Sequence, residues 1–183
     1  RKNKASNDDW ESPADPDAKV AKMKDGTTHL AHKAEHAVDL GEGAHGAILA
    51  VNVCDAAAGD TATVADTIVA ATENLAAVKD DARVADKLGD DFATEAVLDK
   101  GYHRKQTLLD LEEMTVRGYA SEPNRGRQQW DGDAGPEAKA AVYANRRRVT
   151  GARGKRLLRS RGEKLERTFA HCYETGGMRH LYL

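Results

Sequence analysis

The chain has few residues of the kinds that build large cores or cross-links. Only 5% of its 183 residues are aromatic, and its two cysteines, Cys54 and Cys172, lack a CxxC spacing. The cysteine pattern fits a reducing cytosol better than a disulfide framework, and we expect two inert thiols. No apolar run approaches the ~20 residues that span a bilayer, and RKNKASNDDW lacks the apolar region of a secretory signal. We therefore expect a soluble, non-exported domain with a core of Ala, Val and Leu.

Charge is distributed unevenly along the chain. The formal net charge is -2, but residues 146–183 carry 11 Lys and Arg against 3 Asp and Glu, whereas residues 1–145 carry 17 against 27. A basic block of this kind is the usual electrostatic footprint of a phosphate-backbone partner, and the alternative is a solvated helix face. The candidate nucleic-acid contacts are Arg146, Arg147, Arg148, Arg153, Lys155, Arg156, Arg159, Arg161, Lys164 and Arg167.

The N-terminal half divides into a polar leader, a hairpin and a helix. Residues 1–25 are polar and contain prolines among acidic residues, which predicts an irregular leader before a domain at 26–183. Residues 29–40 alternate with period two, GEGAHG follows as turn material, and 47–54 form an apolar run, so we predict two strands joined as a hairpin. Apolar residues at steps of four and three between 61 and 79 predict an amphipathic helix.

The stretch EAVLDKGYHRKQTLLDLEEM predicts a strand, a turn and a helix. EAVLD is short and apolar, as a buried strand is, and the leucine spacing over 104–114 is helical. Asp99 therefore stands at the carboxyl end of a strand, where ligands gather in open α/β sheets. The alternative is that Asp99 has no catalytic role and is a turn residue before Gly101.

The C-terminal half predicts a short strand and two helices. VRGYA at 116–120 is the strand, and a Gly-rich polar loop at 124–135 follows it. A helix then runs over 136–149, TGARG breaks it, and a last helix covers 155–173. Glu166 adjoins the apolar stripe of the last helix, and its alternative role is an intrahelical partner of a nearby Arg or Lys.

Together these segments resemble the catalytic domain of bacterial insertion-sequence DDE transposases. The likeness is carried by VLDKGYHRKQTLLDLEE, by RSRGEKLERTFAHCYETGGMRHLYL, and by the hairpin sequences HLAHKAEHAVDL and AILAVNVCDAAAGDT after DPDAK. In that family a buried strand ends in the second catalytic Asp and a late helix carries the catalytic Glu. The resemblance spans the chain from about residue 15 onward, with the motifs in the family's order and spacing.

The resemblance implies a fold, a chemistry and a partner. The fold is α/β, an RNase H-like mixed sheet with flanking helices, and Asp99 and Glu166 match the second and third catalytic acids. In such enzymes carboxylates hold two Mg²⁺ or Mn²⁺ ions that activate a nucleophile and stabilise the leaving oxygen of a phosphodiester. DNA at insertion-sequence ends, a cytoplasmic, nucleoid-associated location and a homodimer of the intact parent complete what the family implies.

The chain departs from the family pattern at both ends. The family's first strand and its catalytic Asp precede the hairpin, whereas Asp8, Asp9, Asp15 and Asp17 follow no apolar run. Tyr173 stands where the family tends to have Lys, the chain begins at Arg1 without Met, and it stops at MRHLYL. We therefore expect a fragment truncated at both ends, with an incomplete sheet and metal site. Loss of one ligand costs most of the rate, so we expect the fragment to be inactive.

Two other functions remain open from the sequence. One is a non-catalytic DNA-binding protein that uses the Arg-rich segment 146–167, and the other is a metal-dependent nuclease of the same fold. His29, His32 and His36 would form a zinc site only if their segment were helical, which the period-two pattern argues against.

Two further acids have alternative roles. Asp39 could substitute for the missing Asp or initiate a turn. Asp60 follows Gly59 and precedes a helix, so we expect it to cap that helix.

Overall fold

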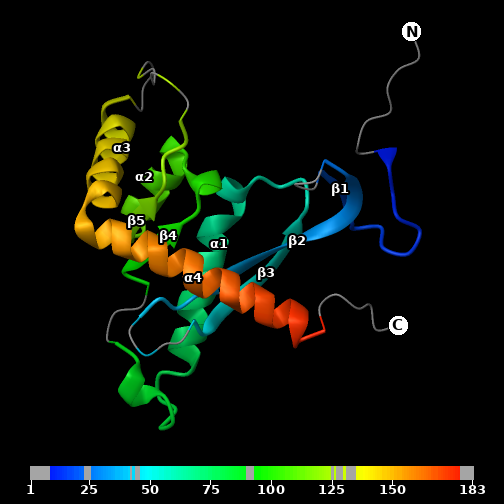
Figure 1. Cartoon of the computed structure of the whole chain (residues 1–183), viewed down its shortest axis with the longest axis horizontal. Helices are drawn as coiled ribbons and strands as arrows, with labels where there is room; N and C mark the ends of the chain where they lie inside the picture. The colour runs from blue at the N-terminus through cyan, green and yellow to red at the C-terminus, as the bar shows by residue number, and fades with distance from the viewer. Residues whose placement is uncertain are drawn as a thin grey trace.

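The elements of the computed structural model alternate between strands and helices (Figure 1). The structure describes residues 9–22, 26–41, 43, 46–89, 93–124, 126, 130 and 135–177. In chain order the elements are β1 (Lys19–Lys22), β2 (Thr28–Val38), β3 (Ile48–Asp55), α1 (Asp60–Ala77), β4 (Glu95–Leu98), α2 (Lys105–Glu113), β5 (Arg117–Ala120), α3 (Gly135–Thr150) and α4 (Ala152–Glu174), with 3₁₀ turns at Ala85–Lys87 and Lys100–Tyr102. The chain is thus a mixed α/β protein, as predicted.

The strands form two separate sheets. Strands β1, β2 and β3 pair antiparallel in the order β1-β2-β3, and β4 pairs with β5 in parallel. The predicted hairpin is confirmed, with His32 opposite Asp55 at one end and Val38 opposite Ile48 at the other. Parallel strands need a crossover connection, and α2 provides it between β4 and β5. Within the described residues no strand pairing joins the two sheets.

The predicted irregular leader contains a strand. Lys19–Lys22 forms β1 and pairs with Thr28 to Ala31 of β2, so the expectation of an irregular leader over residues 1–25 is wrong at 19–22. The segment KVAK is too short and too basic to show an apolar pattern, and its pairing comes from the neighbouring strand rather than from its own propensity. Strand β1 ends at Lys22, not at an acid.

The break between the last two helices is shorter than predicted. Helix α3 ends at Thr150 and α4 begins at Ala152, so Gly151 alone separates them, and it occupies the N-cap position of α4. Gly154 is buried inside α4, where a Cβ atom would collide with the carbonyl oxygen of Arg148. The second glycine of TGARG therefore permits close helix packing and does not end a helix.

The core consists of two small clusters around the β4–β5 sheet. Val64 and Ile68 of α1 pack with Leu111 and Val116 in one, and the other contains Leu108, Ala120, Ala141 and Val142. Leu98 of β4 packs against both clusters. The predicted apolar face of α1 and the leucine spacing of α2 are confirmed.

Helices lie on both sides of the strands. Figure 1 shows α4 crossing in front of β4 toward the β2–β3 hairpin, with α1 behind it. None of the helices in the described part of the chain has the length and apolarity to cross a membrane. Most of the predicted loop at 124–135 and the terminal MRHLYL lie outside the described residues.

Asn145 closes the outer edge of β5. Its side chain is fully buried, donates from Nδ2 to the carbonyl oxygen of Ala120 at 2.8 Å and accepts from the Ala120 backbone N–H at 2.9 Å. One side-chain amide thus satisfies both backbone groups that a further strand would otherwise bond. Arg148 adds a hydrogen bond from Nε to the Gly118 carbonyl oxygen at 2.8 Å.

Replacing Asn145 tests this closure. Asn145→Leu leaves two buried backbone groups of Ala120 unpaired, so we expect the free energy of unfolding to fall by at least about 2 kcal/mol in urea titrations. Arg147→Leu, at an exposed position of the same helix, should change it by less than about 0.5 kcal/mol. Equal effects of the two variants would contradict the role given to Asn145.

Candidate functional site

Asp99 lies directly after β4, as the sequence predicts. Its backbone is extended, with φ -71° and ψ 164°, and the 3₁₀ turn Lys100–Tyr102 follows at once. The side chain is 61% exposed, and Nη2 of Arg161 on α4 lies 3.6 Å from Oδ1. The carboxylate is therefore accessible at a strand end, next to a cation from the last helix.

Glu166 lies elsewhere on α4. It is exposed and stands five residues after Arg161, which corresponds to about 7.5 Å along the helix axis and about 140° around it. Asp99 and Arg161 both line the cavity that is described next, whereas Glu166 does not. Within the described contacts, Arg161 rather than Glu166 reaches Asp99.

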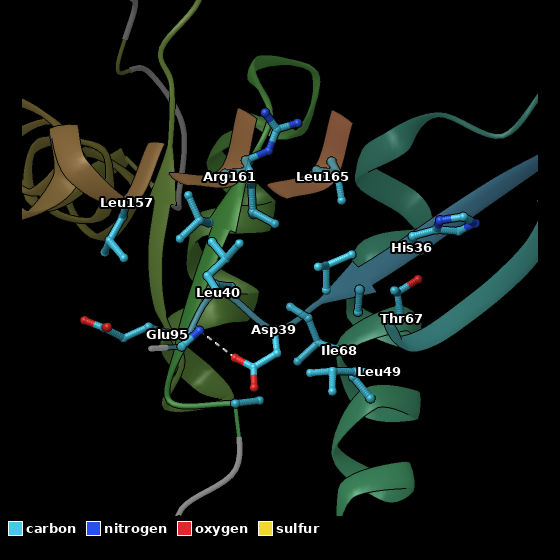
Figure 2. Close-up of a pocket in the computed structure, with 18 of the residues that line it drawn as sticks. His36, Asp39, Leu40, Leu49, Thr67, Ile68, Glu95, Leu157, Arg161 and Leu165 are labelled. Atoms are coloured by element: carbon cyan, nitrogen blue, oxygen red, sulfur yellow. Dashed lines mark hydrogen bonds between the residues drawn. The ribbon is translucent and has the colours of Figure 1, made fainter. Parts of the chain in front are cut away.

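A cavity of about 970 Å³ lies between the two sheets (Figure 2). Residues 34–41 of β2 and the turn after it line one side, and residues 94–99 of β4 line the other. In Figure 2, Leu157 and Leu165 approach this space from α4, and Ile68 approaches it from α1. Such a volume is at the upper end of the range for ligand pockets.

The end of this cavity contains a buried carboxylate that sequence reasoning missed. Glu35 of β2 is 5% exposed and accepts hydrogen bonds from Tyr102 Oη at 2.6 Å, from Thr63 Oγ1 at 3.1 Å and from Thr67 Oγ1. Burial, together with the hydrogen bond to Glu35, raises the pKa of Tyr102, so its hydroxyl stays protonated and donates. The sequence does contain a signal for this buried carboxylate, namely an acidic residue in the middle of a strand whose residues alternate between two faces.

A cation, Lys33, and a second acid, Asp60, complete this cluster. Lys33 Nζ lies 2.7 Å from Asp60 Oδ1 and 3.9 Å from Glu35 Oε1. The predicted helix cap is wrong, because Gly59 occupies the N-cap position and the Asp60 carboxylate points to Lys33 instead. A Cβ atom at Gly101 would lie 2.5 Å from Asp60 Oδ2, so the turn after β4 passes close to this carboxylate.

The three histidines of β2 do not converge on one site. Nε2 of His32 lies 2.8 Å from Asp15 Oδ2, and His36 stacks on Phe169 of α4 with ring centroids 4.4 Å apart. Burial lowers the pKa of His36. His29 forms a hydrogen bond with Thr27, so the three histidines do not share the geometry of a zinc site.

Asp39 initiates a turn, which was the alternative to a role in the metal site. Its Oδ1 accepts a hydrogen bond from the Gly41 backbone N–H at 2.7 Å, drawn as a dashed line in Figure 2. Among the residues that the structure describes, no group of three or more His, Cys, Asp and Glu side chains is arranged to hold a metal ion.

Six of the ten predicted DNA contacts are engaged within the protein. Their partners are Glu122 for Arg146, the Gly118 carbonyl for Arg148, Glu95 for Arg153, Asp99 for Arg161, the Leu40 and Gly41 carbonyls for Lys164, and Glu163 for Arg167. The other four are exposed, and their side chains have no hydrogen bond or ion pair in the described part of the chain. These are Arg147, Lys155, Arg156 and Arg159, which we call the free basic row.

No family model, curated protein or solved structure matches this chain. Its function is therefore inferred from the residues and contacts described above.

Replacing Tyr102 tests the buried carboxylate cluster. Tyr102→Phe removes one donor from Glu35 while keeping the ring, so we expect the free energy of unfolding to fall by about 1–3 kcal/mol in urea titrations. Tyr143→Phe, in an exposed ring on α3, should change it by less than about 0.5 kcal/mol. An unchanged stability of Tyr102→Phe would mean that Glu35 does not depend on this hydroxyl.

The stability contributed by Glu95 should depend on pH. Its hydrogen bond to Arg153 lowers the pKa of Glu95 below the ordinary value of a glutamate side chain, so the folded state favours the carboxylate. This contribution is present above about pH 5 and is lost as the pH falls through the lowered pKa. The stability gap between wild type and Glu95→Gln should therefore shrink from neutral pH to about pH 3, whereas Glu163→Gln, at an exposed carboxylate, should show little gap throughout. A Glu95→Gln gap that does not change with pH would contradict this assignment.

Proposed function

We propose that this chain is a DNA-binding, RNase H-like domain of the insertion-sequence DDE transposase type, and that it does not cleave DNA as it stands. The free basic row on α3 and α4 is the observation that carries the proposal. These cations have no partner in the described part of the chain, and three of them lie on α4, the helix that reaches Asp99 through Arg161. Cations left unpaired in this way are available to phosphates.

The order of elements supports the family assignment. An antiparallel three-stranded unit comes first, β4 and β5 then pair in parallel, and the helix that carries Glu166 comes last. This is the order in which the resemblance places the hairpin, the Asp-bearing strand and the Glu-bearing helix. Asp99 also stands where the resemblance requires the second acid, at the carboxyl end of β4.

The geometry of the basic row suits a DNA backbone. Lys155, Arg156 and Arg159 lie within five residues of α4, and residues four apart share one face of a helix. Arg147 lies near the end of α3, just before the single residue that separates the helices. Arginine guanidinium groups match phosphate oxygens in geometry, so three of the four can form bidentate contacts.

The residues present do not fit a two-metal centre. Such a centre needs carboxylates that converge on Mg²⁺ or Mn²⁺, whereas Asp99 faces Arg161 and Glu166 projects from another side of α4. A cation at Asp99 would compete with the guanidinium group. Metal-dependent cleavage is kept as the second candidate because Asp99 is 61% exposed at its strand end.

DNA binding can be measured by fluorescence anisotropy with a short labelled duplex at several NaCl concentrations. Replacing Arg147, Lys155, Arg156 and Arg159 by Gln should weaken binding and reduce the slope of log K against log salt by about three to four, because each phosphate contact contributes about 0.9. The matched control replaces Lys19, Lys22, Lys79 and Arg83 by Gln, which changes the net charge equally. Equal losses in both variants would mean that net charge, not the basic row, attracts DNA.

The cleavage part is tested separately with supercoiled plasmid and Mg²⁺ or Mn²⁺. We expect no metal-dependent nicking by the wild-type chain. Nicking that disappears in Asp99→Ala would overturn the non-catalytic assignment and favour the transposase or nuclease chemistry. Specificity for insertion ends, the homodimer and the nucleoid location remain predictions of the resemblance.

A further inference from the structure

Two strand edges are left without a neighbour on facing sides of the fold. Strand β1 pairs with β2 only at residues 28–31, so along residues 34–38 one edge of β2 bonds β3 and the other has no strand in the described part of the chain. Strand β4 pairs with β5 on one edge only. An unpaired edge is a row of backbone donors and acceptors that can template another strand.

Both edges line the same cavity. The cavity is lined by every residue from 34 to 41 and by every residue from 94 to 99. Side chains of a strand alternate between faces, so a cavity on one face would touch every second residue. Contact with consecutive residues therefore places the cavity at the edges of both strands, and we call it the inter-sheet groove.

The hydrogen bonds of β4 show which backbone groups face this groove. The Arg117 N–H donates to the Thr94 carbonyl oxygen at 2.9 Å, and the register pairs Glu95 with Arg117 and Val97 with Tyr119. In a parallel pair the backbone groups of alternate residues point to the same neighbour. Ala96 and Leu98 therefore face β5, and the N–H and C=O groups of Glu95 and Val97 face the groove.

Strands β2 and β4 run in opposite directions beside the groove. Along α1, Asp60 lies at Lys33 and Asn74 donates to the Leu49 carbonyl oxygen near the end of β2, so α1 and β2 run the same way. The carboxyl end of β4 lies at the start of α1, because Gly101 passes Asp60. One inserted strand would thus run parallel to one edge and antiparallel to the other, and both patterns form regular ladders.

Both helices contribute apolar side chains to the groove, and the charges at both ends of β4 are paired. Helix α1 contributes Val64 and Ile68 beside Asp60, and α4 contributes Leu157, Leu165 and Phe169 beside Arg153, Arg156 and Arg161. The charges of β4 are already paired with α4, through Arg153 to Glu95 and Arg161 to Asp99. A strand covered by helices on both faces is apolar throughout rather than alternating.

We propose that the inter-sheet groove accepts an extended apolar segment of another polypeptide, which adds a strand between β2 and β4. The two edge rows specify an extended backbone, and the apolar residues of the two helix faces favour apolar side chains. Backbone hydrogen bonds supply affinity in such strand addition, and the side-chain pockets supply specificity. The groove is a different site from the free basic row, although Arg156 belongs to both.

Hydrogen exchange followed by NMR tests the groove first without any ligand. In the free chain the Val97 amide should exchange at least tenfold faster than that of Leu98, which faces β5. A panel of peptides with six consecutive Val, Ile or Leu residues, matched to the six residues 94–99 that line the groove, is then added. Flanking Lys residues keep the peptides soluble. Binding should slow exchange at Val97 at least tenfold, and peptides with Pro at alternate positions should not bind.

Variants locate the binding site. Val97→Pro removes an N–H that faces the groove while leaving those that face β5, and Ser160→Trp fills the groove from α4. Each should raise the peptide Kd at least tenfold, whereas Val53→Lys, on an exposed position of β3, should change it less than twofold. Should Val97→Pro lose the protection of Leu98, Ser160→Trp decides the outcome.

Several results would overturn the proposal. One is a Val97 amide that exchanges as slowly as the Leu98 amide in the free chain at every protein concentration. The second is failure of the whole peptide panel to bind, and the third is binding that neither groove variant weakens. Protection that increases with protein concentration in the absence of peptide would identify a second copy of this chain as the occupant instead.

Discussion

The hydrogen bond from Tyr102 to the buried carboxylate of Glu35 joins two halves of the fold that share no strand pairing in the described residues. Glu35 belongs to the antiparallel sheet, and Tyr102 follows the parallel one. A buried carboxylate is costly unless donors surround it, and Thr63 and Thr67 of α1 supply two more. Strand β2, helix α1 and the turn after β4 are therefore held at one point, and the placement of Asp99 depends on it.

The same arrangement separates the two acids from each other and leaves a groove open. Arg153 and Arg161 bind α4 to the two ends of β4, which directs the apolar side of that helix over the groove. Glu166 consequently lies on another side of α4, and Arg161 takes the place beside Asp99. The basic residues divide in the same way, since those that hold α4 in position are occupied and the free basic row remains for other partners.

Local patterns predicted much of the fold. Alternation identified the hairpin, steps of three and four identified α1, and the short run before Asp99 identified β4. Strand β1 was missed because four residues with two lysines carry no pattern of their own. The strand alternation also did not indicate that the face bearing Glu35 would be the buried one, because its donors come from α1 and from Tyr102, distant in sequence.

The sequence by itself determined the order of the elements, the position of Asp99 at a strand end and the concentration of cations in the last two helices, because each depends on residues close together in the chain. Only the tertiary structure decided which charges are available. Arg161 forms an ion pair with Asp99, and Lys33 forms one with Asp60 at the start of α1. Both ion pairs join segments far apart in sequence. The open edges of β2 and β4 were likewise decided by packing, since backbone pairing follows which strands meet and not which residues they contain.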